Sequence, residues 1–163
     1  MVWKDDDVSD TAMPPPQKRA RPRDELGRPL PWGSENRLDL EDFDALPTDE
    51  NHRLAIAHFN AGRFFPAHEA WETAWKQSKG TPDEEFFKGL SQLGAGYTHY
   101  ARGNPHGTHT LIRRGTGRIR GFGPLHHGVD VEVLVREAEE HAHLAEEVEG
   151  TGRPMPSFDH PRI

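Results

Sequence analysis

Apolar residues recur every three or four positions through the middle of the chain, which is the period of one face of an α-helix. Five such stretches are separated by short connections, so we expect an all-α, compact antiparallel bundle of about five helices. None of the stretches alternates in the manner of a β-strand. The expected helices cover about residues 49–61, 66–79, 82–102, 105–122 and 130–149.

Capping residues support three of the expected helix starts. Thr48 is expected to cap the first helix, and Asn104, which precedes a proline, is expected to open the fourth. Thr81 is expected to cap the third helix, with Pro82 in its first position and Glu84 closing a capping box. The fourth helix is weakened by its glycines, because each costs about 1 kcal/mol against alanine in a helix interior.

Both ends of the chain are rich in proline and charge and lack a sustained period. We therefore divide the chain into an N-terminal tail over residues 1–47, a helical domain over 48–149 and a C-terminal tail over 150–163, with both tails disordered or loosely docked. The basic run PPPQKRARPR is interpreted as a solvated linker, with a localisation or nucleic-acid tag as the alternative. Apolar side chains that can dock the N-terminal tail are Leu26, Leu30, Trp32, Leu38, Leu40 and Phe43.

Composition narrows the class of protein. None of the 163 residues is cysteine, which excludes disulfides, thiolate metal sites and cysteine nucleophiles and suits a reducing compartment. No apolar run is long enough for a membrane span or a signal peptide. The formal charge of −7 argues against nucleic acid as the main partner. We expect a cytoplasmic protein with no membrane partner.

The stretch FFPAHEAWETAWK places polar and apolar residues on one helix face. On a helical wheel, His68 and Glu72 share a stripe with Trp71 and Trp75, so we expect the two polar residues on the core side, with Glu69 at its edge. A buried carboxylate needs a partner, and His68 lies one turn from Glu72. The two residues are interpreted as an acid–base pair or two metal ligands. The alternative is a hydrogen-bond network that only fixes helix packing.

The third helix carries residues that are expected to meet this pair. Gln92 and His99 lie two turns apart on a glycine-rich face, where another backbone can approach closely or a pocket can form. We expect both to face His68 and Glu72, although His99 is equally suited to bind carbonyls at the helix end. Other histidines are weaker candidates: His141 on the apolar face of the fifth helix, His143 with Glu147 on its solvated face, and His126 and His127, which the pattern does not place.

Charge is divided unevenly between the last two helices. No acidic residue occurs from Phe86 to Val129, whereas the fifth helix is strongly acidic. We expect these two helices to lie side by side and neutralise each other. The alternative is an anion site, for which nucleic acid is disfavoured because interleaved aromatic residues are missing. The candidate anion ligands are Arg113, Arg114 and Arg118.

Two blocks, FNAGRFFPAHEAWETAWK and FFKGLSQLGAGYTHYARGNPHGTHTLIRR, together resemble the bacterial domain-of-unknown-function family numbered 309. The resemblance covers about residues 50–122, with Thr108 at a position where the family often has alanine. It implies a compact all-helical domain with no established activity, and it supports the grouping of the polar residues above. The matching positions are Phe59, Asn60, Gly62, Phe64, Ala67, His68, Glu69, Trp71, Glu72, Trp75, Gly89, Leu90, Gln92, His99, Gly103, Asn104 and Gly107.

We therefore expect a buried His/Glu/Gln pocket that holds a small ligand or supports hydrolysis assisted by a divalent metal. The alternatives are a non-catalytic structural or interaction module and an anion-binding or nucleic-acid-binding domain. A homo-oligomer is compatible with the pattern, and whether the domain is an enzyme stays open. The candidate catalytic residues are His68, Glu69, Glu72 and His99; the candidate metal ligands are His68, Glu72 and His99; and Asn60, Trp71, Trp75 and Gln92 are expected to line or pack the pocket.

Overall fold

Five α-helices make up most of the computed structural model, which describes residues 21–163. The all-α prediction is confirmed, because the one sheet within these residues is a two-stranded hairpin. Most of the basic run PPPQKRARPR lies outside the described residues. The elements are η1 (Phe43–Ala45), α2 (Thr48–Asn60), α3 (Phe64–Gln77), α4 (Glu84–Ala101), α5 (Pro105–Ile119), η2 (Arg120–Phe122), β1 (Leu125–His126), β2 (Val129–Asp130) and α6 (Val131–Val148).

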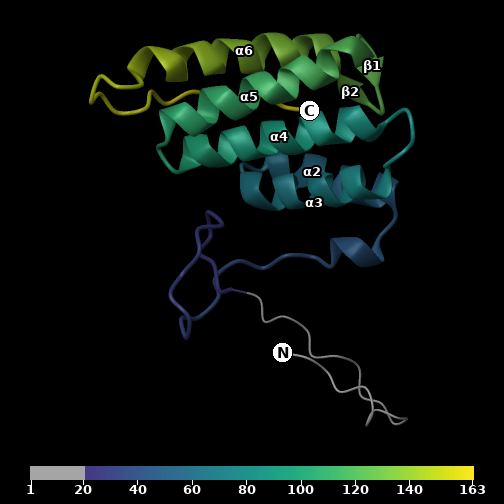
Figure 1. Ribbon diagram of the computed structural model, residues 1–163, viewed down its shortest axis with the longest axis horizontal. Coiled ribbons are helices and arrows are strands. Elements are labelled where there is room, and N and C mark those ends of the chain that lie inside the picture. Colours follow the sequence, from purple (N-terminus) through teal and green to yellow (C-terminus); the bar gives the residue numbers. More distant parts are fainter. Residues whose placement is uncertain (1–20) are drawn as a thin grey trace.

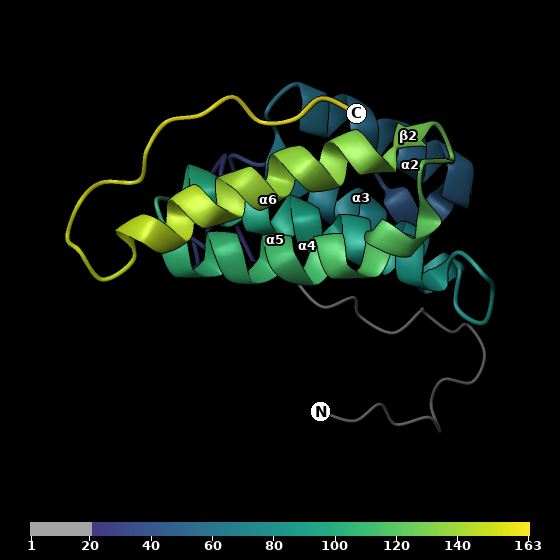
Figure 2. The ribbon, with the colours of Figure 1, turned by 90° about the horizontal axis from the view of Figure 1, so that it is seen from above.

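Successive helices run antiparallel, and each packs on the helix that follows it in the sequence (Figure 1). In that view α2 and α3 form the lower layer, α4 and α5 lie above them, and α6 covers the top. Seen from above, α6 runs along α5 and α4 (Figure 2). α4 is therefore the central helix, with one side against α3 and the other against α5.

The helix starts follow the predicted caps only in part. Asn104 caps α5 as predicted, since its side-chain oxygen accepts a hydrogen bond from the Gly107 amide. The prediction for α4 is wrong, because this helix begins at Glu84 and Thr81 lies in the preceding turn. There the Thr81 hydroxyl donates to the Ser78 carbonyl, and the Glu84 carboxylate accepts from the Gly80 amide. Local hydrogen bonds of the turn thus replace the expected capping box. At α2, Thr48 is the first helical residue and Pro47 the cap position.

Aromatic rings from three helices meet in the core. Phe59 of α2 packs edge-on against Tyr97 of α4, with ring centroids 5.3 Å apart, and it lies 5.8 Å from Trp71 of α3. All three side chains are fully buried. Burial of each large apolar side chain contributes about 1.5–3 kcal/mol, so this cluster fixes how α2, α3 and α4 pack.

Glycines bring α4 and α5 into close contact. A Cβ atom added at Gly115 would lie only 2.7 Å from the carbonyl oxygen of Gly89, and one added at Gly96 would lie 2.9 Å from the backbone nitrogen of Ile112. Any larger residue would push the two backbones apart. The glycines that weaken the helix propensity of α5 therefore also permit its packing, and the glycine-rich face of α4 is occupied by α5.

A short hairpin, which the sequence did not predict, connects α5 to α6. Leu125 pairs with Asp130 and His126 with Val129, and the intervening His127 and Gly128 both have positive φ angles, 46° and 78°. Each strand has only two residues, too few for an alternating pattern to be visible in the sequence.

The N-terminal segment from residue 21 onward packs against α3 and α4. Gly27 lies directly on the ring of Phe65, and the guanidinium of Arg102 donates two hydrogen bonds to the carbonyl of Leu26. Among the apolar residues predicted to dock this segment, Phe43 is buried, whereas Trp32 is 54% exposed. The segment is therefore anchored mainly through its backbone and through η1.

The C-terminal segment returns along the bundle and docks on three helices. The ring of Phe158 stacks on His141 of α6 and on Tyr100 of α4, at centroid distances of 4.0 and 4.1 Å. The amide and carbonyl of Ile163 both bind the side chain of Asn60 on α2. None of the helices between residues 21 and 163 combines the length and the apolar composition needed to span a bilayer.

Candidate functional site

The core face of α3 is turned by about a quarter of a turn from the predicted stripe. Ala67, Trp71 and Ala74 are fully buried, and on a helical wheel they centre about 90° away from His68. The side chains of His68 and Glu72 are 21% and 34% exposed. These two residues therefore lie at the edge of the core, next to α4, and not inside it.

His68 is held on α4 through one ring nitrogen. Its Nδ1 lies 2.8 Å from the carbonyl oxygen of Ser91 and 3.0 Å from the Ser91 hydroxyl. Helix α3 comes close enough because residue 94 is glycine: a Cβ atom there would lie 3.0 Å from the Cα of His68. Since a carbonyl oxygen can only accept, Nδ1 carries a proton, and the second ring nitrogen, Nε2, is left to face other groups.

Two carboxylates face that second nitrogen. Nε2 of His68 lies 3.7 Å from Glu69 and 3.9 Å from Glu72, and Glu72 also lies 3.5 Å from the ammonium group of Lys76. With Nδ1 protonated, a neutral His68 would present a lone pair to two negative groups. A second proton, on Nε2 or on one carboxylate, removes this repulsion. The three side chains are therefore suited to share a proton.

Glu69 is the carboxylate most affected by its surroundings. Burial raises the pKa of Glu69 above its ordinary value; the neighbouring Glu72 also raises it, while His68, Arg23 and Lys76 partly offset the rise. Glu69 thus binds a proton more readily than an exposed glutamate does.

The side chain of Glu69 also lines a pocket. The N-terminal segment and Glu69 of α3 line an open pocket of about 730 Å³. Arg21, Arg23, Ser34 and Asn36 of the segment line this pocket, and Glu69 lines it from α3. Through Glu69, the proton-sharing group is connected to a space that can hold a small molecule.

The other two residues predicted for this cluster bind elsewhere. Gln92 accepts a hydrogen bond from Arg118 of α5, and Nδ1 of His99 lies 3.0 Å from the Asn104 side chain at the start of α5. Burial lowers the pKa of His99, as do the charges of Arg102 and His68. Both side chains thus contact the α5 side of α4.

The residues predicted to line the pocket or to bind an anion make contacts within the fold. Trp71 lies in the core, Asn60 binds the C-terminal residue, and the ring of Trp75 lies about 5 Å from the ammonium groups of two lysines. Two of the three arginines form ion pairs: Arg113 with Glu146 of α6, at 2.8 Å, and Arg118 with Glu85 of α4. The expected neutralisation between α5 and α6 is therefore present at Arg113.

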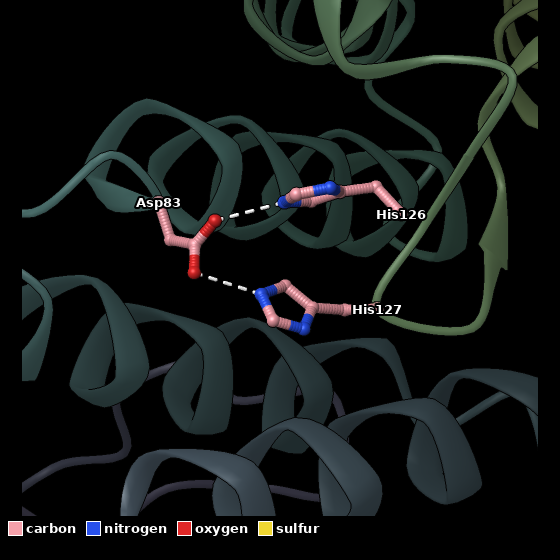
Figure 3. A group of neighbouring side chains, drawn as sticks. All are labelled: Asp83, His126 and His127. Carbon is pink, nitrogen blue, oxygen red and sulfur yellow. Dashed lines mark hydrogen bonds and ion pairs between the residues drawn. The ribbon is translucent and has the colours of Figure 1, made fainter.

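The structure contains two histidine clusters that the sequence pattern does not reveal. Asp83 binds both His126 and His127 with its two carboxylate oxygens (Figure 3), and Glu149 at the end of α6 binds His106 and His109 of α5. Within residues 21–163, these are the groups whose potential metal-ligating atoms all lie within 4.8 Å of one another, and the predicted set of His68, Glu72 and His99 is not among them. Burial raises the pKa of Asp83, but hydrogen bonds from His127 and His126 outweigh burial, so that the pKa lies below its ordinary value. The adjacent histidines were visible in the sequence, but their partner was not.

Residues 52–111 match the model of a family described as Domain of unknown function (DUF309). The match confirms the resemblance predicted from the sequence, and the family description assigns no activity. The matched residues include His68, Glu69 and Glu72 of the proton-sharing group, and they end before His126. A comparison with curated proteins found no match.

Proposed function

We propose that this helical domain binds a small molecule in the Glu69 pocket and that His68 and Glu69 act on it as an acid–base pair. One observation carries the proposal: His68 is fixed through Nδ1 on Ser91, and its Nε2 faces two carboxylates, one of which lines a pocket. An acid–base residue is effective when its pKa lies near the working pH, and burial raises the pKa of Glu69 toward that range.

The chemistry assigned to the site is proton transfer during hydrolysis. Protonated Glu69 donates its proton to the leaving oxygen of the bound ester as the bond to that oxygen breaks and a water oxygen bonds to the other fragment. The proton lost by the water passes to Nε2 of His68, whose lone pair is free because Nδ1 carries the ring proton, and from there back to Glu69. Arg21 and Arg23 line the same pocket together with Asp39, so the two guanidinium groups can bind a negative group of the ligand while Asp39 accepts hydrogen bonds from it.

The metal-assisted version of this reaction fits the α3 face less well, because His99 binds the Asn104 side chain instead of completing a ligand set. A purely structural role for the cluster makes a different prediction: replacing His68 and Glu69 would change stability but no activity. The lack of cysteine and the resemblance to a bacterial family support placing the protein in a bacterial cytoplasm.

The test is an activity screen of the purified protein with chromogenic nitrophenyl carboxylate esters, phosphate esters and glycosides. We expect turnover of at least one class, reduced about 100-fold or more in both His68→Gln and Glu69→Gln, the usual contribution of an acid–base group. Glu147→Gln is the matched control, because His143 and Glu147 form a similar pair on the solvent side of α6, 3.7 Å apart. Turnover that persists in Glu69→Gln, or no turnover and no thermal shift with any compound, would contradict the proposal.

A further inference from the structure

A second constellation lies at the end of the bundle where the β1–β2 hairpin meets the start of α4. Nε2 of His126 and Nε2 of His127 each lie 2.8 Å from a different oxygen of Asp83 (Figure 3). The carboxylate points between the two imidazoles, which reach toward it from the hairpin. Two imidazoles and one carboxylate are thus gathered from segments more than 40 positions apart in the sequence.

The carboxylate of Asp83 does not make the hydrogen bond that its position at the start of α4 suggests. Asp83 stands at the N-cap position of α4, where an aspartate usually accepts a hydrogen bond from the first turn of the helix. Its side chain makes no such bond, and both oxygens are directed to the histidines instead. The helix gives up a cap worth about 1 kcal/mol, so the orientation toward the hairpin has to be stabilised from elsewhere.

The hairpin turn directs His127 toward Asp83. His127 and Gly128 both have positive φ, the geometry of a tight hairpin turn in which asparagine followed by glycine is preferred. Histidine is, with asparagine and aspartate, among the residues other than glycine that adopt positive φ most often, so the turn accommodates His127. From this position its side chain reaches Asp83.

A hydrogen-bond chain ties the turn to the core. Trp71, which is fully buried, donates from its indole nitrogen to Nδ1 of His52 at 3.0 Å, and Nε2 of His52 lies 3.0 Å from the carbonyl oxygen of His127. An indole can only donate, so it fixes His52 with its proton on Nε2, which donates to His127. The backbone that carries the two histidines is thus held in place before a metal ion binds.

Aromatic rings fix the two imidazoles as well. Phe86 packs edge-on against His126 at a centroid distance of 4.6 Å, and Phe87 stacks on His127 at 5.7 Å. On its open side the cluster borders a pocket of about 510 Å³, which His127, Asp83 and His52 line together with Ser78 and Thr81. The arrangement is rigid on the protein side and accessible on the other.

From this geometry we propose that Asp83, His126 and His127 bind one divalent transition-metal ion of the zinc class. Imidazole nitrogens and a carboxylate oxygen are the ligands such ions prefer, and three protein ligands leave a coordination position for water facing the pocket. On binding, each imidazole releases Nε2 to the metal and carries its remaining proton on Nδ1. His52 acts as a positioning residue, because it holds the backbone of His127 and not the metal.

The competing explanation is that Asp83 merely hydrogen-bonds the hairpin to α4. Isothermal titration of the untagged full chain with Zn²⁺ separates the two. We expect saturable binding in the wild type and an affinity at least about 100-fold lower in His127→Asn, since losing a ligand exceeds the loss from a second-shell partner. Asparagine suits the positive φ, so this variant retains the turn; its melting curve checks the fold, and Asp83→Asn is the second variant should it unfold.

The control addresses the other histidine cluster. His106→Asn is the same substitution at an exposed histidine that pairs with Glu149, and it should leave the Zn²⁺ affinity of the hairpin cluster within about twofold. The visible absorption of bound Co²⁺ supplies a second readout, because its intensity reports a four-coordinate site. The proposal is overturned if the wild type does not bind Zn²⁺ at micromolar concentration. It is also overturned if His127→Asn binds as tightly as the wild type, or if only His106→Asn weakens binding.

Discussion

The polar face of α3 and the histidine hairpin use the same chemical groups but are assembled in opposite ways. On α3, the three side chains come from His68–Glu72, and a single helical turn brings them together at distances of 3.7 and 3.9 Å. In the hairpin cluster, Asp83 meets two histidines from beyond α5 at 2.8 Å. Both groups are partly exposed, but the local group is loose, whereas the long-range group is tight and is tied to the core through His52 and Trp71.

Because of this difference, the two regions should respond to different substitutions. The α3 group depends on one helix and on its contact with Ser91, so it should respond to changes of charge more than to changes in the core. The hairpin cluster depends on Trp71 and His52, so it should respond to the core as well.

Trp71→Phe should have the largest effect. It leaves a gap in the core and leaves Nδ1 of the buried His52 without a donor, which together should lower the free energy of unfolding by about 2–4 kcal/mol. Urea denaturation measures this loss. If the hairpin cluster is positioned through His52, its Zn²⁺ affinity should also fall about tenfold or more.

Trp75→Phe is the matched control for that change. Trp75 lies on the same helix, but its indole nitrogen is buried without a hydrogen-bond partner among the described residues. Removing this nitrogen should cost less than about 1 kcal/mol, because no hydrogen bond is lost. Equal destabilisation by the two substitutions, or unchanged Zn²⁺ affinity in Trp71→Phe, would show that the hairpin does not depend on the Trp71–His52 chain.

A smaller and opposite effect is expected at Glu69. Because burial raises the pKa of Glu69 in the folded state, its contribution to stability is present below its ordinary pKa, near pH 4, and is lost as the pH rises through the raised value. The surrounding charges are His68, Glu72, Arg23 and Lys76. Glu69→Gln lacks this loss, so it should be more stable than the wild type at neutral pH by less than about 1 kcal/mol.

Thermal denaturation of the wild type and Glu69→Gln between pH 4 and pH 8 measures this difference. The stability gained by the substitution should grow as the pH rises. Glu147→Gln, at an exposed glutamate of α6, should follow the wild-type profile. A Glu69→Gln protein that is less stable than the wild type at pH 7 would show that the charged carboxylate is favoured where it lies.

The helices of this fold could be predicted from the sequence because their signals are local. Apolar residues with a helical period, the cap at Asn104 and the glycines after each helix place all five, with ends within a few residues of the structure. The exact start of α4 could not be predicted, since the hydrogen bonds of Thr81 within its turn compete with the capping box.

The rotation of α3 differs from the prediction because two alanines, and not Trp75, complete its core face. Trp75 was assigned to the core, but it is only partly buried and lies close to Lys79 and Lys88. The small residues Ala67 and Ala74 are the ones that face the core. A stripe drawn through Trp75 therefore places the core face too close to His68, and the polar pair is less buried than expected.

The hairpin cluster could not be found by pattern at all. His126 and His127 follow a glycine-rich break, and their partner Asp83 lies in a helix cap on the far side of two helices in the sequence. Only the antiparallel packing of α4 and α5 returns the chain to the same end of the bundle (Figure 1). A site that forms only when the chain returns to the same end of the bundle can be recognised only from the tertiary structure.

The central claim is that the His68 ring is fixed through Nδ1, so that its Nε2 faces Glu69 and Glu72. The most direct test is nitrogen NMR of the His68 ring at a pH at which the ring is neutral, in the wild type and in Glu69→Gln. We predict that the neutral ring carries its proton on Nδ1 in both proteins, because the Ser91 carbonyl can only accept. A neutral ring protonated on Nε2 would contradict the account.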